Sequence, residues 1–246
     1  MSPLKSAAVS FAVVLSGFVV FSFQLAAGTD AADERGLVTY VRGETEKKKA
    51  GTDWVPVPEK STVESGDTMQ TKRKSRAEVS IESGKTVRLD ENTIVDLVKL
   101  LEQEQQKRDI QLDVEQGQVW ASISALGAND DFKINSPFAG AAVRGTVFNY
   151  AVTGDNLKID VFKGAVEVYN PFRPIDVPKP GQIIVAPRDV PGPRDISREE
   201  WTKLLIQTRQ SVTVGLAGGP PPAIAPISEK TLNDEWTRWN QGRDAN

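Results

Sequence analysis

The sequence predicts an all-β domain over residues 36–187, and three observations lead to this. Apolar and polar residues alternate in short runs, as over residues 77–81 and 110–114. The runs recur at a spacing of about ten residues, separated by turn-forming residues such as Ser83-Gly84. Strands with one buried and one wet face show this alternation. No long helical period interrupts the block, so a parallel βαβ architecture is not expected.

Two β architectures fit this pattern, a twisted solenoid of stacked turns and a sandwich of two sheets. The periodicity alone does not distinguish them. Within the block, the stretch from Glu102 to Asp109 is too charged for an interior strand. It therefore predicts the tip of a hairpin between strands at Ile94–Leu101 and Ile110–Val114.

Residues 1–29 precede the domain and contain an apolar run without any charge between Lys5 and Asp30. The run of about 20 residues fits either a cleaved secretory signal peptide or a membrane anchor at residues 7–27. Both would place the rest of the chain outside the cytoplasm, in the periplasm or the extracellular space, with the anchor holding it at the inner membrane. Since the chain has no Cys, attachment as a lipoprotein is excluded.

Residues 188–246 differ in character and are predicted to form a linker and a helical tail. Pro191, Gly192 and Pro193 begin the linker. A helix is predicted at residues 197–210, because Ser197 and Glu200 have the spacing of a capping box. Its apolar stripe consists of Trp201, Leu204 and Leu205.

A second helix is predicted at residues 228–239, after a linker rich in Gly and Pro. Leu232, Trp236 and Trp239 are spaced i, i+4 and i+7, so they share one face of this helix. Such a face either packs against the chain's own β domain or binds a partner protein as a helix in a groove. The candidate partner-binding residues are therefore Trp201, Leu232, Trp236 and Trp239.

The composition removes several classes of chemistry. The chain has no His and no Cys, which excludes zinc sites built on thiolates or imidazoles and nucleophilic systems with a His base. A net charge of −3 and a pI near 5.3 argue against nucleic-acid binding. No catalytic residue, metal or cofactor is expected. Carboxylate chemistry stays open, so a glycan hydrolase remains as the least favoured alternative.

Residues 138–150, FAGAAVRGTVFNY, combine several small residues with one arginine. The segment lacks the glycine spacing of a phosphate-binding loop, and no helix follows it. Glycine in such a place more often marks a bend or a close approach of two backbones in a sheet. We expect a tight corner here, with Arg144 buried and bridging strands through a carboxylate or backbone carbonyls.

Several segments in a fixed order resemble the FecR domain family. They include TDWVPVPEK, LDVEQGQVW, FKINSPFAGAAVRGTVFNYAV and GQIIVAP, and they extend over about residues 36–187. The resemblance implies a periplasmic or extracellular, twisted solenoid-like β domain in which the small residues form a structural corner. The positions that match the family's signature are Trp54, Gly66, Asp67, Arg144, Gly145, Thr146 and Phe148.

The resemblance has a limit. The namesake members of the family are transmembrane regulators of iron–siderophore uptake, whose long cytoplasmic segment holds an extracytoplasmic-function sigma factor. Only residues 1–6 precede the apolar run here. The sigma-factor role is therefore not expected to apply to this chain.

Taken together, these features favour an exported, non-enzymatic module that binds or scaffolds components of the bacterial envelope. The expected partner is an envelope protein. A receptor for a cell-wall or extracellular polysaccharide is the alternative.

Overall fold

The computed structural model describes residues 35–245 except for residues 83, 105–106, 125, 128–129, 171–202 and 216–221. All described residues belong to one compact unit, Ala32–Asn246. The predicted signal peptide or anchor at residues 1–29 lies outside them. Neither helix in the described part of the chain has the length and apolar character needed to cross a membrane.

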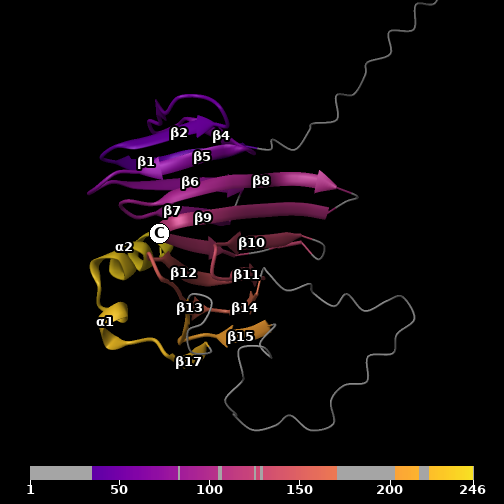
Figure 1. The fold of residues 1–246 in the computed structure, drawn as a ribbon, viewed down its shortest axis with the longest axis vertical. Coiled ribbons are helices and arrows are strands. Elements are labelled where there is room, and N and C mark those ends of the chain that lie inside the picture. Colours follow the sequence, from indigo (N-terminus) through magenta and orange to yellow (C-terminus); the bar gives the residue numbers. More distant parts are fainter. Residues whose placement is uncertain are drawn as a thin grey trace, which may run out of the picture. The chain divides into compact units, whose positions relative to one another are not determined.

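The prediction of a mostly β domain is confirmed, since strands account for most of the described residues (Figure 1). The strands form two sheets, here called sheet A and sheet B, which share the long strand β9 (Lys107–Ile123). The first half of β9 pairs in sheet B and its second half pairs in sheet A. All pairings between described strands are antiparallel, except the parallel pair of β9 and β10 (Asp131–Asn135).

Along each sheet the strands follow one another in approximate chain order (Figure 1). The order in sheet A is β4 (Thr62–Glu64), β1 (Arg35–Arg42), β6 (Arg76–Glu82), β7 (Lys85–Leu89), β9, β12 (Val147–Val152), β13 (Asn156–Lys163), β16 (Gln210–Gly215) and β17 (Ala223–Pro226). The order in sheet B is β3 (Val55–Pro56), β2 (Thr45–Lys49), β5 (Asp67–Thr71), β8 (Ile94–Glu104), β9, β10, β11 (Gly140–Val143), β14 (Ala165–Tyr169) and β15 (Lys203–Gln207).

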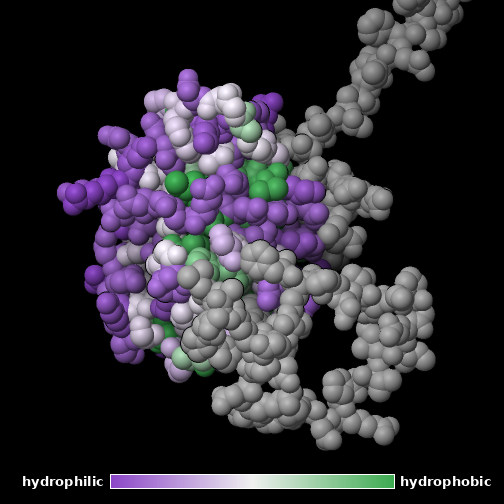
Figure 2. Space-filling model, in the orientation of Figure 1, coloured by the Kyte–Doolittle hydropathy of each residue, from purple (hydrophilic) through white to green (hydrophobic). Residues whose placement is uncertain are grey.

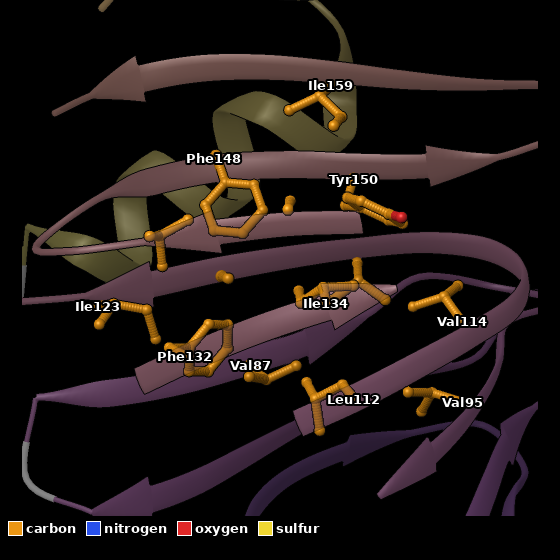
Figure 3. Close-up of a cluster of buried hydrophobic side chains, with 14 of the residues drawn as sticks. Val87, Val95, Leu112, Val114, Ile123, Phe132, Ile134, Phe148, Tyr150 and Ile159 are labelled. Atoms are coloured by element: carbon orange, nitrogen blue, oxygen red, sulfur yellow. The ribbon is translucent and has the colours of Figure 1, made fainter. Parts of the chain in front are cut away.

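The core lies between the two sheets, because the inward side chains of both belong to one buried cluster (Figure 3). Sheet A contributes residues such as Val87, Phe148 and Ile159, and sheet B contributes Leu112 and Phe132. The outward side chains are largely polar. In the view of Figure 2 the described surface is mostly hydrophilic, with a small hydrophobic area over β8.

The predicted hairpin at Glu102 to Asp109 is confirmed, although its strands are longer than expected. β8 continues to Glu104 and β9 begins at Lys107, and the pairing extends to these two residues. Charge excludes a strand from an apolar interior, but it does not stop two strands from pairing at the end of a hairpin.

The corner predicted at residues 138–150 is a close approach of two backbones. β11 lies in sheet B and β12 in sheet A, so the turn between them carries the chain across the domain. Gly145 in this turn has φ +64°, and Gly164 faces it with φ +80°. A Cβ atom on Gly164 would lie 2.6 Å from the carbonyl oxygen of Gly145. The predicted burial of Arg144 is wrong, because its side chain is exposed on the turn.

The predicted helix at residues 197–210 is also wrong in its described part. Residues 203–207 form strand β15, and Gln210 begins β16. Leu204 and Ile206 are buried while their neighbours are exposed, which is a period of two. The open edge of β14 supplies the hydrogen bonds for β15. The β domain therefore continues beyond residue 187, and Ser197 to Trp201 lie outside the described residues.

The second predicted helix, at residues 228–239, forms in two pieces. α1 covers Glu229–Leu232 and α2 covers Glu235–Asp244. The chain breaks between them because Asp234 acts as a new N-cap, accepting a 2.6 Å hydrogen bond from the backbone N–H of Thr237. The longer piece, α2, consequently begins and ends later than the predicted helix at residues 228–239.

Candidate functional site

The candidate site is the outer face of sheet A where α2 packs against it (Figure 1). Strand alternation creates this face. In β6, Ala77 and Val79 point into the core. Side chains alternate along a strand, so Arg76, which precedes Ala77, and Glu78, which lies between Ala77 and Val79, point outward. In the same way β7, β9 and β12 present outward the side chains of Arg88, Trp120 and Asn149. All five outward residues are nevertheless buried, because α2 covers them.

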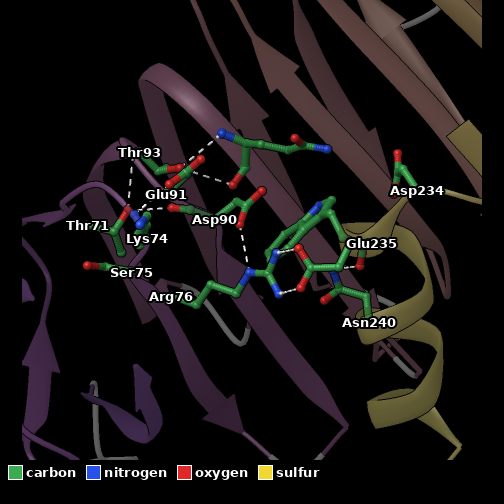
Figure 4. Close-up of polar contacts among 12 residues, drawn as sticks. Thr71, Lys74, Ser75, Arg76, Asp90, Glu91, Thr93, Asp234, Glu235 and Asn240 are labelled. Atoms are coloured by element: carbon green, nitrogen blue, oxygen red, sulfur yellow. Dashed lines mark hydrogen bonds and ion pairs between the residues drawn. The ribbon is translucent and has the colours of Figure 1, made fainter. Parts of the chain in front are cut away.

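Arg76 forms the contact nearest the start of α2 (Figure 4). Its guanidinium donates two hydrogen bonds to the Glu235 carboxylate, at 2.9 and 3.0 Å, and a third to Asp90 at 2.8 Å. It also lies 5.1 Å from the ring centroid of Trp236 and 5.0 Å from that of Trp239. A planar cation can satisfy carboxylates at its edge and aromatic rings at its face at the same time. Arg76 therefore binds α2 through both kinds of contact.

Glu78 forms the second contact, between two arginines. It accepts a 2.6 Å hydrogen bond from Arg88 and two 2.9 Å hydrogen bonds from Arg243 of α2. Thr39 donates a further one at 2.6 Å. Burial by itself raises the pKa of Glu78, but these hydrogen bonds outweigh it and lower the pKa to about 2. Glu78 is consequently ionised at any physiological pH.

The end of α2 is held by Asp244. It accepts a 2.7 Å hydrogen bond from Arg88 and a 3.0 Å hydrogen bond from the indole N–H of Trp120. In the first turn of the helix, the indole N–H of Trp236 donates to Asn149 at 3.0 Å. The polar groups that α2 buries thus find partners on the sheet, as buried polar groups must.

A cavity of about 380 Å³ opens beside the first turn of α2. Its wall carries charges of both signs, from the turn before β6, the end of β7 and the helix itself. The lining residues are Arg42, Lys74, Arg76, Asp90, Glu91, Asp234, Glu235 and Trp236. Within the described ranges, no three His, Cys, Asp or Glu side chains gather in a way that could hold a metal ion.

The tail residues predicted for partner binding lie as follows. Trp236 is buried, with 4% of its surface exposed. Trp239 stacks on it at 5.4 Å between ring centroids and also contacts Tyr40 at 5.6 Å. Leu232 is half-buried in α1. Trp201 lies outside the described residues.

The residues of the family signature lie elsewhere, in turns and in the core. Gly66 has φ +82° in the turn before β5. The buried Asp67 beside it forms a 2.9 Å ion pair with Lys47. Lys48 lies over the ring of Trp54 at 4.6 Å. Thr146 donates a hydrogen bond to the carbonyl of Ala165 at 2.8 Å, and Phe148 is fully buried.

Sequence reasoning missed the sheet residues of the site, namely Arg76, Glu78, Arg88, Trp120 and Asn149. Charged residues at alternate strand positions normally indicate a solvated face. Trp120 was the available signal, since a large aromatic residue at a polar position of a strand suggests that something covers that face.

The model of the FecR protein family matches residues 67–167. Over this range the chain therefore matches the FecR family that its sequence resembles. The matched region runs from β5 to β14 and includes most of the sheet face under α2. The comparison with curated proteins found no match.

Among solved structures, two crystal structures of a protein from Parabacteroides distasonis, provisionally named an anti-sigma factor, resemble this chain. The sequence identities are 15% and 14%, and both TM-scores are 0.46. Each match covers 71% of this chain. The chain spans 65% of the length of the first structure and 64% of the second.

Proposed function

We propose that this protein is a non-enzymatic binding and scaffolding module of the bacterial envelope, exported by its N-terminal apolar segment. The FecR domain at residues 67–167 supports a role in binding or regulation. The observation that carries the proposal is the outer face of sheet A, which holds the chain's own helix α2 through arginines, carboxylates and stacked aromatic rings. Arginine and aromatic side chains are enriched at protein–protein interfaces, so this face has the composition of an interface, and α2 is its built-in occupant.

In this proposal α2 serves as a brace that completes sheet A. Three buried charged side chains, Arg76, Glu78 and Arg88, each have a partner on the helix. Losing those partners would leave buried charges less well compensated, which is costly. The envelope protein would then contact the surface that α2 leaves uncovered. Trp236 and Trp239 could bind a partner only if α2 left sheet A.

Co-purification of cross-linked envelope proteins tests this division of roles. The full chain and a chain that ends at Ile227 would be compared, together with their melting temperatures. We expect the shortened chain to melt at a lower temperature and, below that temperature, to retain its partner. Loss of the partner without a change in melting would show that the tail is the partner-binding segment.

Export is tested separately, with a reporter that is active only in the cytoplasm fused after Asn246. We expect no reporter activity, because the apolar run after Lys5 would direct the following residues across the membrane. Strong activity would contradict the proposed location.

A further inference from the structure

Sheet B presents an unusual alignment of polar and aromatic side chains on its outer face. One residue from each of eight consecutive strands lies at the same register level, from β2 to β15. The pairings that establish this row are Lys48 with Thr68, Thr68 with Asp96, Asp96 with Asp113, Asp113 with Asn135, Asn135 with Gly140, Gly140 with Tyr169, and Tyr169 with Lys203.

Hydrogen bonds within the row fix the orientation of its side chains. Tyr169 donates to Asn135 at 2.5 Å, and Asn135 donates to Asp113 at 2.8 Å. Further along, Thr68 donates to Asp96 at 2.6 Å. These residues are only half-buried, so the row is ordered in advance and still reaches solvent. Ordered polar groups lose little entropy when a ligand binds.

Tyr169 lies across the backbone of β11 at Gly140. A Cβ atom at Gly140 would come within 2.2 to 2.6 Å of three atoms of the tyrosine side chain, so only glycine allows the ring to rest there. Its hydroxyl group is held by Asn135. Burial and the nearby Asp113 raise the pKa of Tyr169 to about 12, so the hydroxyl group stays protonated. The ring is therefore a fixed platform within the row.

A second aromatic side chain marks the opposite end of the row. Lys48 lies over the ring of Trp54 at 4.6 Å, and Trp54 is partly exposed. Six strand spacings separate β2 from β14, which at about 4.8 Å each gives a distance of roughly 29 Å. The face is therefore a long strip with an aromatic ring towards each end and hydrogen-bonding groups between.

We infer that this strip binds a linear, uncharged polysaccharide, lying across the strands from Trp54 to Tyr169. A sugar ring in an extended chain is about as long as the strand spacing of about 4.8 Å, so successive sugars would meet successive strands. Carboxylates and amides pair with sugar hydroxyl groups, and an aromatic face covers the apolar face of a sugar ring.

The charges of the row favour an uncharged chain. Asp96 and Asp113 stand at its centre and would repel a polyanion. Lys48 and Lys203 stand near its ends, and Lys203 is already paired with Glu167 at 2.8 Å. This site lies on the opposite sheet from α2 and does not depend on the proposed binding of an envelope protein.

Calorimetric titration of the full chain with soluble cello- and chito-oligosaccharides tests the inference. We expect binding that strengthens from the tetramer to the hexamer, because a longer chain meets more strands. Tyr169→Ala and Asp113→Ala should each weaken binding at least tenfold, whereas Tyr169→Phe, which keeps the ring, should weaken it only a few-fold. Lys163→Ala, on sheet A, is the matched surface control.

Melting curves of every variant show whether weaker binding results from unfolding. If Asp113→Ala does not fold, Asp113→Asn replaces it. An oligogalacturonate of the same length is the anionic probe, and we expect it not to bind. The inference is overturned if the wild-type chain binds no uncharged oligosaccharide at millimolar concentration. It is equally overturned if binding survives both Tyr169→Ala and Asp113→Ala, or if the anionic probe binds more tightly.

Discussion

At the scale of single residues, the balance between burial and pairing decides how a charged group contributes to stability. Glu78 is buried, which disfavours its charge, yet its hydrogen bonds from Arg243, Arg88 and Thr39 lower its pKa from 4.5 to about 2. A carboxyl group with a lowered pKa in the folded state contributes stability above its ordinary pKa. That contribution is lost as the pH falls from 4.5 towards 2.

We predict that Glu78→Gln destabilises the protein at pH 7 by about 3–5 kcal/mol, because Arg88 and Arg243 lose a buried counter-charge. The variant should also lose less stability than the wild type between pH 4.5 and pH 2.5. Urea unfolding at several pH values measures both effects. Glu115→Gln, at an exposed position of β9, is the control and should behave as the wild type. Parallel pH profiles for Glu78→Gln and the wild type would contradict the role of Glu78.

Gly164 shows the effect of space at a single position. Its φ of +80° disfavours any side chain, and a Cβ atom would also meet the Gly145 carbonyl at 2.6 Å. Gly66 has a similar φ of +82°, with nothing within 4 Å of such an atom. We predict that Gly66→Ala costs about 1–2 kcal/mol from backbone strain alone, and that Gly164→Ala costs at least 1 kcal/mol more. Equal losses in denaturant unfolding would show that the corner is not tightly packed.

At the scale of elements, α2 is a short helix whose stability depends on its contacts with sheet A. A helix of 10 residues is marginal alone in water. Its contacts combine ion pairs at both ends with the buried Trp236 in the first turn, and the indole N–H of Trp236 is bonded to Asn149. The helix and the sheet face therefore stabilise each other.

We predict that Trp236→Ala lowers the unfolding free energy by about 3 kcal/mol, since a buried aromatic side chain and its hydrogen bond are lost. The melting temperature should fall by about 6–12 °C for a chain of this size. Gln241→Ala, at an exposed position of α2, is the control and should change it little. If both variants melt together with the wild type, α2 does not brace sheet A.

At the scale of the whole described unit, strand β9 links the two sheets, because it pairs in sheet B at one end and in sheet A at the other. The side chains of both sheets also share one core cluster. Neither sheet can lose its packing without exposing the inner face of the other. The two sheets should therefore unfold in a single cooperative transition.

We predict that Leu112→Ala, in the sheet B half of β9, shifts the unfolding of sheet A as well. The lost packing should amount to about 2–5 kcal/mol. Amide hydrogen exchange in β12 and β13 on sheet A should speed up together with exchange in β10 and β11 on sheet B, and the far-UV circular dichroism transition should move to lower denaturant concentration. If exchange in the sheet A strands stays as in the wild type while exchange in the sheet B strands speeds up, the sheets unfold separately.

Local patterns in the sequence predict the β character of the domain, the hairpin between β8 and β9, and the close approach of backbones near Gly145. The sequence also indicates the FecR domain. These features depend on neighbours in the chain, since alternation and turn residues act over a few positions. The spacing of Trp236 and Trp239 likewise predicts that they share a helix face, as they do in α2, whereas Leu232 lies in the separate helix α1. The local pattern does not show what covers the two tryptophans.

The remaining features follow from tertiary contacts, which bring together residues that are far apart in the chain. Residues 203–207 carry apolar positions compatible with a helix, and they form a strand because the edge of β14 is open to them. Arg144 stands on an exposed turn, whereas Arg76, in a basic run, is buried under α2. The row from Lys48 to Lys203 depends on the register of eight strands. Such register is fixed by packing between distant segments, and no local pattern contains it.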